Sequence, residues 1–118
     1  MKKPDSFEQA CEMQGYDQAT ALPDVSKMPE HLQAYTLAAN KRLIIAEAIK
    51  GGKHPGPKDR HWFPVFNSLG AFVFSGTDSS YTFTTLGARL DFNTETESDF
   101  FGENFADLHE AVMVIKEQ

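Results

Sequence analysis

The feature that most constrains the fold is a long helical segment that begins at Pro29 and ends at the Gly51-Gly52 pair. Proline suits the first turn of a helix, where its missing N–H would have no partner, and paired glycines stop one. Apolar residues recur at helical spacing on two sides of the segment. One side has Leu32, Tyr35, Ala39, Leu43 and Ala46, and the other has Leu37, Ala38, Ile44, Ile45 and Ala48. A helix that is apolar on two sides is usually buried on both, so we expect it at the domain centre or in a dimer contact.

The last helix has the clearest sequence signature. Thr94 and Glu97 have the spacing of a capping box, and acids in the first turn suit the positive end of the helix dipole. Apolar residues follow at spacings of four, three, four and three: Phe101, Phe105, Leu108, Val112 and Ile115. At about 100° per residue they fall in one narrow stripe. We expect one continuous amphipathic helix that carries this stripe.

A shorter helix is expected near the start of the chain. Asp5 and Glu8 have capping-box spacing, and the helix should run over residues 6–13 with Gly15 ending it. The residues that would face inward are Phe7, Ala10 and Cys11. Residues 16–28 contain a proline and show no sustained period, so they are expected to form an ordered connector.

Segments rich in aromatic and β-branched residues follow a loop that holds three glycines and two prolines, residues 51–60. These segments are His61–Phe66, Ala71–Ser75, Tyr81–Thr85 and Ala88–Phe92. Turn-like residues separate them, including the stretch Gly76–Ser80. Together they predict a three- or four-stranded antiparallel meander, with Pro64 placing the first segment at an edge. Alternating aromatics in these strands are typical of a core rather than of a ligand-binding face.

These elements define the expected fold class, which is α+β with the order α-α-β-β-β-(β)-α and helices packed on one face of the sheet. The chain has 118 residues, 41% of them hydrophobic, which suits one domain over residues 1–118 with a core that needs no staples. Cys11 is the single cysteine, so a disulfide within the chain and a cysteine-based zinc site are both excluded. The polar start resembles no signal peptide, and no apolar stretch reaches membrane-spanning length. A cytoplasmic protein is therefore expected.

The formal net charge of −6 is concentrated in the last 26 residues, which hold seven acids and one base. Acids at a spacing of four would share one face of the last helix: Glu95, Asp99, Glu103 and Asp107, continued by Glu110 and Glu117. The simplest interpretation is a solvated face that keeps the protein soluble. The alternative is an anionic surface for a basic protein partner or a partial mimic of nucleic-acid charge. Carboxylates fanned along an open helix do not converge as catalytic groups must.

A second polar feature lies where basic residues lead directly into aromatic ones. It comprises Lys53, His54, Lys58, Arg60 and Trp62. Single-stranded nucleic acid is bound by such a mixture, because bases stack on rings while Lys and Arg follow phosphates. The alternative is structural, with Trp62 and Phe63 packed in the core beneath a charged loop. The overall acidity argues against generic binding of duplex DNA.

The remaining chemistry-bearing residues give no site. The four histidines show no metal-ligand spacing. His54 and His61 with Asp59 could meet across a loop and hold a metal, but a first coordination shell needs three or four convergent ligands, so this is the lesser alternative. His31 and His109 are expected on helix surfaces. Cys11 has no base identifiable from the sequence, and residues 76–80 lack the lysine and helix of a phosphate loop. We therefore predict no metal, no cofactor and no catalytic residue.

Several strings resemble a known family. They are KKPDSFEQACEMQGYDQATALPDV, RLIIAEAIKGG, HWFPVF, and GARLDF leading into FFGENFADLHEAV. Together they are similar, over nearly the whole chain, to small uncharacterised proteins from mobile or prophage-like elements of intestinal anaerobes. This chain departs from that family at Asp91-Phe92-Asn93, where members have Cys-Phe-Lys, and at Lys53, where members have Trp. The resemblance implies a genomic context, that of an accessory protein of a mobile element, and no activity.

The sequence thus favours a non-enzymatic binding or interaction module. Its expected partner is another protein, bound through the acidic helix or the 53–63 segment, and a homodimer is a further option. The alternative is a single-stranded nucleic-acid binder that uses the basic and aromatic residues. A small enzyme with an unrecognised site is the third hypothesis, and no membrane partner is expected.

Overall fold

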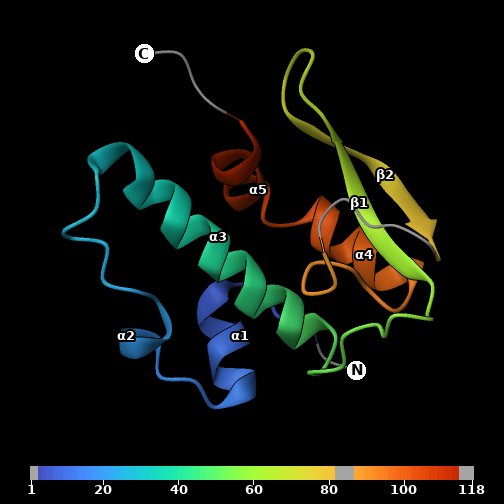
Figure 1. The fold of residues 1–118 in the computed structure, drawn as a ribbon, viewed down its shortest axis with the longest axis horizontal. Helices are drawn as coiled ribbons and strands as arrows, with labels where there is room; N and C mark the ends of the chain where they lie inside the picture. Colours follow the sequence, from blue (N-terminus) through green and yellow to red (C-terminus); the bar gives the residue numbers. More distant parts are fainter. Residues whose placement is uncertain (1–2, 82–86, 115–118) are drawn as a thin grey trace.

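The computed structural model describes residues 3–81 and 87–114 of the chain. Its elements are α1 (Phe7–Gln14), α2 (Gln18–Ala21), α3 (Glu30–Ile49), β1 (His61–Asn67), β2 (Val73–Ser80), α4 (Glu95–Glu103) and α5 (Ala106–Met113). Figure 1 shows α3 crossing the molecule between α1 and α5, with α4 lying against the β1–β2 hairpin. The fold is α+β, as predicted. Within the described ranges, no helix has the length and apolar character needed to cross a bilayer.

The hairpin is the part of the fold that the sequence predicted least well. The described residues contain a two-stranded antiparallel sheet, so the predicted meander of three or four strands is not found there. The segment expected as a last strand, Ala88–Phe92, forms a turn that ends in a single bridge between Trp62 and Phe92. The segment Tyr81–Thr85 falls almost wholly outside the described residues. Pro64 does lie in an edge strand, since both strands of a two-stranded sheet are edges.

The residues predicted as a turn at 76–80 belong to β2. The register changes between Val65 and Phe66, which pair with Gly76 and Phe74, so Ser75 is an extra residue in β2. Gly76 takes a φ of 131°, a value that favours glycine, at this β-bulge. The glycine therefore marks a bulge within a strand and not the end of one.

The helix starts follow capping chemistry. In α1 the N-cap is Ser6, whose hydroxyl accepts from the Gln9 N–H at 3.1 Å, so the predicted Asp5–Glu8 box is wrong by one residue. Gln9 Oε1 in turn accepts from the Asp5 N–H. Gly15 ends α1 with a φ of 73°, as predicted. In α4 the predicted cap is confirmed, because Thr94 accepts from the Glu97 N–H and the Glu97 carboxylate accepts from the Asn93 N–H.

The predicted continuous last helix is wrong. It is divided into α4 and α5 by Asn104 and Phe105, and Phe105 has a left-handed φ of 61°. The break turns α5 against α3 while α4 stays under the hairpin (Figure 1). Phe105 keeps its apolar contacts across the break, since its ring lies near those of Phe100 and Phe101. Ile115, the last member of the predicted stripe, lies outside the described residues.

The core forms where α1, the C-terminal half of α3 and α4 meet. Its fully buried members include Cys11, Ile45, Ile49, Phe92 and Phe101. The inward residues predicted for α1 are confirmed. The two-sided burial predicted for α3 is found in its C-terminal half, where Ala46 is buried on one side and Ile45 on the other, but not in its N-terminal half. Leu32 and Tyr35 are exposed, because the N-terminal half of α3 extends beyond the core. Its buried line is instead Ala38, Arg42, Ile45 and Ile49.

Candidate functional site

The predicted acidic face does not exist as one surface, because the helix that would carry it is broken at Asn104. Asp99 faces the hairpin and accepts a hydrogen bond of 2.6 Å from the Thr77 hydroxyl. Glu95, Glu103 and Asp107 are exposed, but Asp107 lies on α5 after the break, and Glu110 is only partly exposed. Glu117 is outside the described residues. The acids therefore point from two helices in different directions.

The basic and aromatic residues of the 53–63 segment are only partly brought together. Lys53 and Lys58 are exposed, whereas Phe63 is buried. The Arg60 guanidinium lies 4.2 Å from the ring centre of Tyr81 and 5.7 Å from that of Trp62. Its Nη1 donates to the Ser79 hydroxyl at 2.7 Å. Arg60 and these two rings therefore form a small cluster at the open end of the hairpin.

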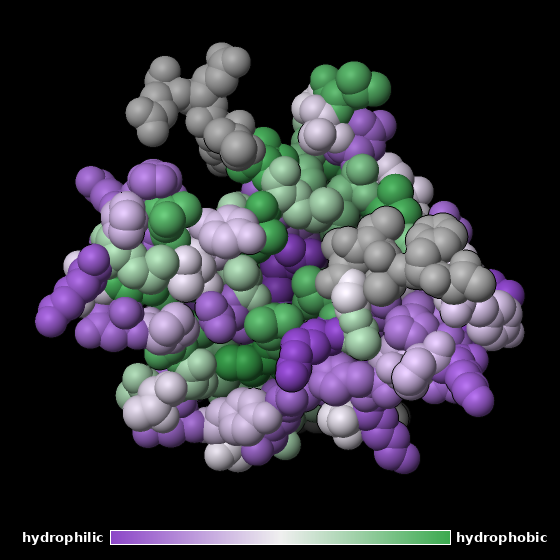
Figure 2. Space-filling view, viewed as in Figure 1, coloured by the Kyte–Doolittle hydropathy of each residue, from purple (hydrophilic) through white to green (hydrophobic). Residues whose placement is uncertain are grey.

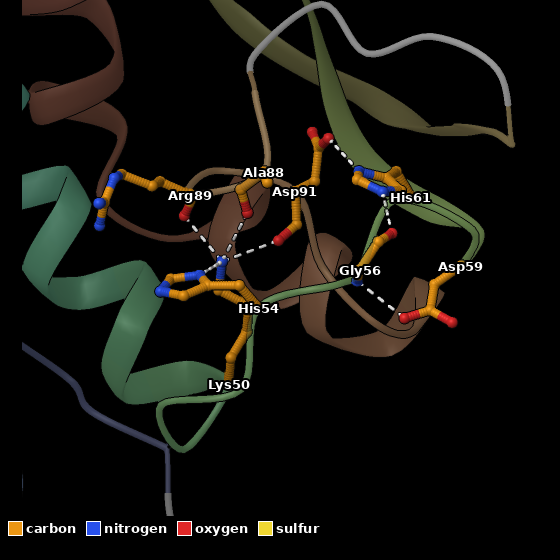
Figure 3. A network of polar contacts seen from close by, with 8 residues as sticks. All are labelled: Lys50, His54, Gly56, Asp59, His61, Ala88, Arg89 and Asp91. Carbon is orange, nitrogen blue, oxygen red and sulfur yellow. Dashed lines mark hydrogen bonds and ion pairs between the residues drawn. The ribbon is translucent and has the colours of Figure 1, made fainter.

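A polar network that the sequence did not predict surrounds Lys50, the residue that follows α3. Lys50 is 3% exposed, and its Nζ donates to the carbonyl oxygens of Ala88, Arg89 and Asp91 at 2.7–3.2 Å. Nζ also lies 2.7 Å from His54 Nδ1. Figure 3 shows the ammonium group enclosed by these four acceptors, which come from two separate loops. Lys50 therefore fixes the 87–91 turn and the 53–60 loop to the end of α3.

The protonation states in this network follow from burial. Burial lowers the pKa of Lys50 to about 8, so the ammonium form still prevails at pH 7. Burial and the Lys50 charge lower the pKa of His54, which is therefore neutral at pH 7. A neutral His54 has a lone pair on Nδ1 that faces Lys50, and the three ammonium protons are shared among this nitrogen and the three carbonyl oxygens. The positive charge thus stays on the lysine, surrounded by carbonyl dipoles.

A second pair adjoins the network at Asp91, whose side chain is fully buried. Asp91 Oδ2 lies 2.7 Å from His61 Nδ1, and His61 Nε2 lies 2.9 Å from the Gly56 carbonyl oxygen. Both partners are acceptors, so a cationic His61 satisfies both bonds by donating twice. The hydrogen bond to Asp91 accordingly raises the pKa of His61. Figure 3 shows the imidazole held between Asp91 and the loop at Gly56.

This Asp–His pair cannot work as a general base in the state described. A catalytic imidazole needs one nitrogen free to take a substrate proton. Here Nε2 is held by Gly56, and the hypothetical metal set of His54, Asp59 and His61 does not converge, since Asp59 accepts from the Gly56 N–H instead. No group of three metal-ligating side chains occurs in residues 3–81 and 87–114. The network around Lys50 and Asp91 is thus suited to fixing loops.

Arg42 is a second unpredicted feature. It lies in the buried line of α3 with 2% of its surface exposed, and its Nε and Nη2 have no hydrogen-bond partner among the described residues. The guanidinium carbon lies 5.8 Å from the ring centre of Phe101. Burial lowers the pKa of Arg42 to about 10, so the group remains charged at neutral pH. Each unpartnered buried N–H lowers the stability of the fold by roughly 1–3 kcal/mol, so the buried Arg42 guanidinium is destabilising.

His109 lies near Arg42 and corrects a prediction, because it is fully buried and not on a helix surface. Its Nε2 donates to the Phe101 carbonyl oxygen at 2.6 Å, and its Nδ1 has no partner in the described structure. Burial lowers its pKa to about 4, with the Arg42 charge contributing. His109 is therefore neutral at pH 7, with an acceptor lone pair on Nδ1. His31, in contrast, is exposed as predicted.

Cys11 is buried in the core, as predicted, and burial raises the pKa of its thiol. A thiol that stays protonated at neutral pH is a poor nucleophile.

The sequence signals for these sites differ in strength. Arg42 could have been found, because it interrupts an apolar line at spacings of four and three, from Ala38 to Ile45 and Ile49. His109 sits beside the predicted apolar stripe, and its burial follows from the break at Phe105, which the sequence does not signal. Nothing in the sequence distinguishes Lys50 from an ordinary basic residue at a helix end.

Comparisons with known proteins found no match to this chain among protein-family models, curated proteins or solved structures.

Proposed function

We propose that this protein is a non-enzymatic binding module that contacts a protein partner through the tip and outer face of its β1–β2 hairpin. The observation that carries the proposal is that residues 62–77, which form the tip of the hairpin and most of both strands, lack acidic and basic side chains, although the rest of the molecule is highly charged. From Trp62 to Thr77 the sequence has no Asp, Glu, Lys or Arg, although such residues make up 24% of the chain. Figure 1 shows the hairpin standing away from the helices at its loop end.

The exposed side chains of the hairpin support a protein surface as the partner. Leu69 is 97% exposed at the tip, and Val65 and Val73 are 41% and 50% exposed on the strands. Figure 2 shows strongly hydrophobic atoms at the protruding end of this element. Exposed edge strands usually carry charges that prevent pairing with other chains. The part of both strands near the tip carries none, since Asp78 lies near the far end of β2, and this favours a partner that covers it with apolar side chains.

The test compares hairpin variants in a pull-down from a native host lysate treated with nuclease. Leu69→Asp combined with Val73→Lys places charges on the proposed surface without touching the core. Met13→Glu is the control, since Met13 is an exposed apolar residue on α1, 38% exposed, and lies outside the hairpin. We expect a stoichiometric protein partner with wild type and with the control, and its loss with the hairpin variant. Equal recovery by all three proteins would overturn the proposal.

A second candidate function is binding of single-stranded nucleic acid, and the Arg60 cluster favours it. Tyr81 is 59% exposed and its ring is stacked with a guanidinium, as in surfaces that bind bases. Exposed Lys53 and Lys58 could follow phosphates. A fluorescent oligonucleotide titrated at increasing salt tests it: affinity should fall steeply with salt and be lost in Arg60→Ala combined with Tyr81→Ala. Salt-independent or absent binding would eliminate this candidate.

We further infer an accessory role in a mobile element from the resemblance of the four sequence strings to small proteins of such elements.

A further inference from the structure

Arg42 occupies a position in α3 where the pattern of the helix calls for an apolar residue. The line Tyr35, Ala38, Arg42, Ile45 and Ile49 has spacings of three and four, so all five side chains leave the helix on one side. From Ala38 onward this side is buried, and Arg42 is its single charged residue. A methionine would fill the same position without the cost of a buried charge.

The surroundings of Arg42 do not neutralise it. No carboxylate of the described residues pairs with the guanidinium, and its near neighbours are Tyr35 and the rings of Phe101 and His109. Its unpartnered Nε and Nη2 lie side by side on one edge of a planar group. Two parallel N–H donors on this edge match the two oxygens of a carboxylate or a phosphate.

No partner of this fork lies within residues 3–81 and 87–114, and the surrounding groups suit an anion. We infer that Arg42, with His109 beside it, binds a single small oxyanion of phosphate or carboxylate chemistry between α3 and α5. The Nε and Nη2 protons take two of its oxygens. His109 Nδ1, an acceptor with no partner among the described residues, takes a protonated oxygen when the ion is a hydrogen phosphate. A carboxylate has no such proton and would be held by the Arg42 donors alone.

The site is closed in the form described, so entry of the ion requires side chains to move. Phe66 of the hairpin covers His109, with ring centres 4.8 Å apart, and is itself only partly buried. This inference does not depend on the proposed function, because it concerns the interior between α3 and α5 and not the hairpin tip.

The experiment uses the full chain and three salts at matched ionic strength: sodium phosphate, sodium acetate and sodium chloride. Thermal unfolding and the NMR signal of the Arg42 Nε–H are followed as each is added. We expect phosphate or acetate, but not chloride, to raise the unfolding midpoint saturably and to shift this signal. The salt that gives the saturable response shows whether the site prefers phosphate or carboxylate. If neither oxyanion gives a saturable response, the inference is overturned.

Variants separate the site from general salt effects. Arg42→Met should weaken oxyanion binding by more than roughly tenfold, because it removes both donors. Without oxyanion it should unfold at a higher temperature than wild type, because it removes the unpartnered charge. Arg89→Met is the matched control at an exposed arginine and should bind as wild type does. An equal response in Arg42→Met would refute the assignment. If that variant does not fold, the wild-type NMR titration decides alone.

Discussion

His109 illustrates how burial of one residue sets a pH dependence for the whole chain. An unfolded chain holds its histidines near their ordinary pKa of about 6.5, whereas burial lowers the pKa of His109 to about 4. Between these values the unfolded state binds more protons, so stability falls as pH falls from 6.5 to 4. This contribution is up to about 3 kcal/mol.

His109→Gln should remove that contribution, since a glutamine amide can still donate to the Phe101 carbonyl oxygen but does not titrate. We expect the free energy of unfolding, measured in urea at pH 7 and pH 4.5, to differ less between the two pH values in this variant than in wild type. His31→Gln, at an exposed histidine, should leave the difference unchanged. Equal effects of the two substitutions would show that His109 is not the group responsible.

His61 acts in the opposite direction, because its hydrogen bond to Asp91 raises its pKa. Its contribution to stability is complete below the unfolded pKa of about 6.5 and is lost as pH rises through the folded pKa. Asp91→Asn should therefore lower the free energy of unfolding more at pH 6 than at pH 9, by roughly 1–3 kcal/mol at the lower pH. Urea unfolding checks this, with Asp107→Asn at an exposed carboxylate as control. A loss that is independent of pH would contradict it.

At the scale of elements, the contact between α4 and the hairpin depends on one glycine. A Cβ at Gly102 would lie 2.3 Å from the Phe74 ring and 2.9 Å from Pro64 Cβ. Alanine inside a helix normally stabilises it by about 1 kcal/mol relative to glycine. Here we expect the opposite sign, a loss of roughly 1–3 kcal/mol, because α4 must move away from the hairpin. Thermal unfolding of both variants measures this effect. Gly70→Ala, in the open hairpin loop, should leave the free energy of unfolding nearly unchanged. A stabilised Gly102→Ala would show that α4 does not pack so closely.

The elements that the sequence predicts well are those defined by local chemistry. Pro29 and Gly51-Gly52 mark the limits of α3 to within a residue or two, and Thr94 marks the start of α4. The break at Phe105 was missed because apolar spacing continues across it, as its ring remains in the core while the backbone turns. Apolar periodicity in a sequence predicts which side chains are buried. It does not reveal a change of helix direction that leaves the same side chains buried.

The buried polar groups of the candidate sites could not be predicted from the sequence, for a physical reason. Charge alone made site candidates of Lys53, Lys58 and the acids of α4. Most of these side chains are exposed and have no unusual environment. The groups with unusual environments are Lys50, Arg42 and His109, each buried by elements distant in sequence. Their burial depends on how α3, α5 and the 87–91 turn meet, which no local pattern encodes. Only Arg42 breaks an apolar pattern and so left a signal.

At the scale of the whole molecule, Lys50 joins the helical part to the hairpin. Its three carbonyl partners belong to the 87–91 turn, which leads directly into Phe92. Phe92 and Trp62 exchange two backbone hydrogen bonds, of 2.7 and 3.0 Å, and Phe92 is fully buried against Phe101. The chain therefore connects α3, the turn, β1 and α4 through one ammonium group and one bridge.

Lys50→Met tests this connection, because methionine fills the volume but donates no hydrogen bond. The Asp91 carbonyl oxygen would lose its donor, so we expect the free energy of unfolding to fall by about 2 kcal/mol. Hydrogen exchange should locate the effect: the Trp62 and Phe92 amides lose protection, while those of α1 and the middle of α3 keep it relative to the new global stability. Lys53→Met, three residues later and exposed, should change neither measurement. Uniform loss of protection across all helices would mean that Lys50 stabilises the fold globally and does not specifically fix the 87–91 turn.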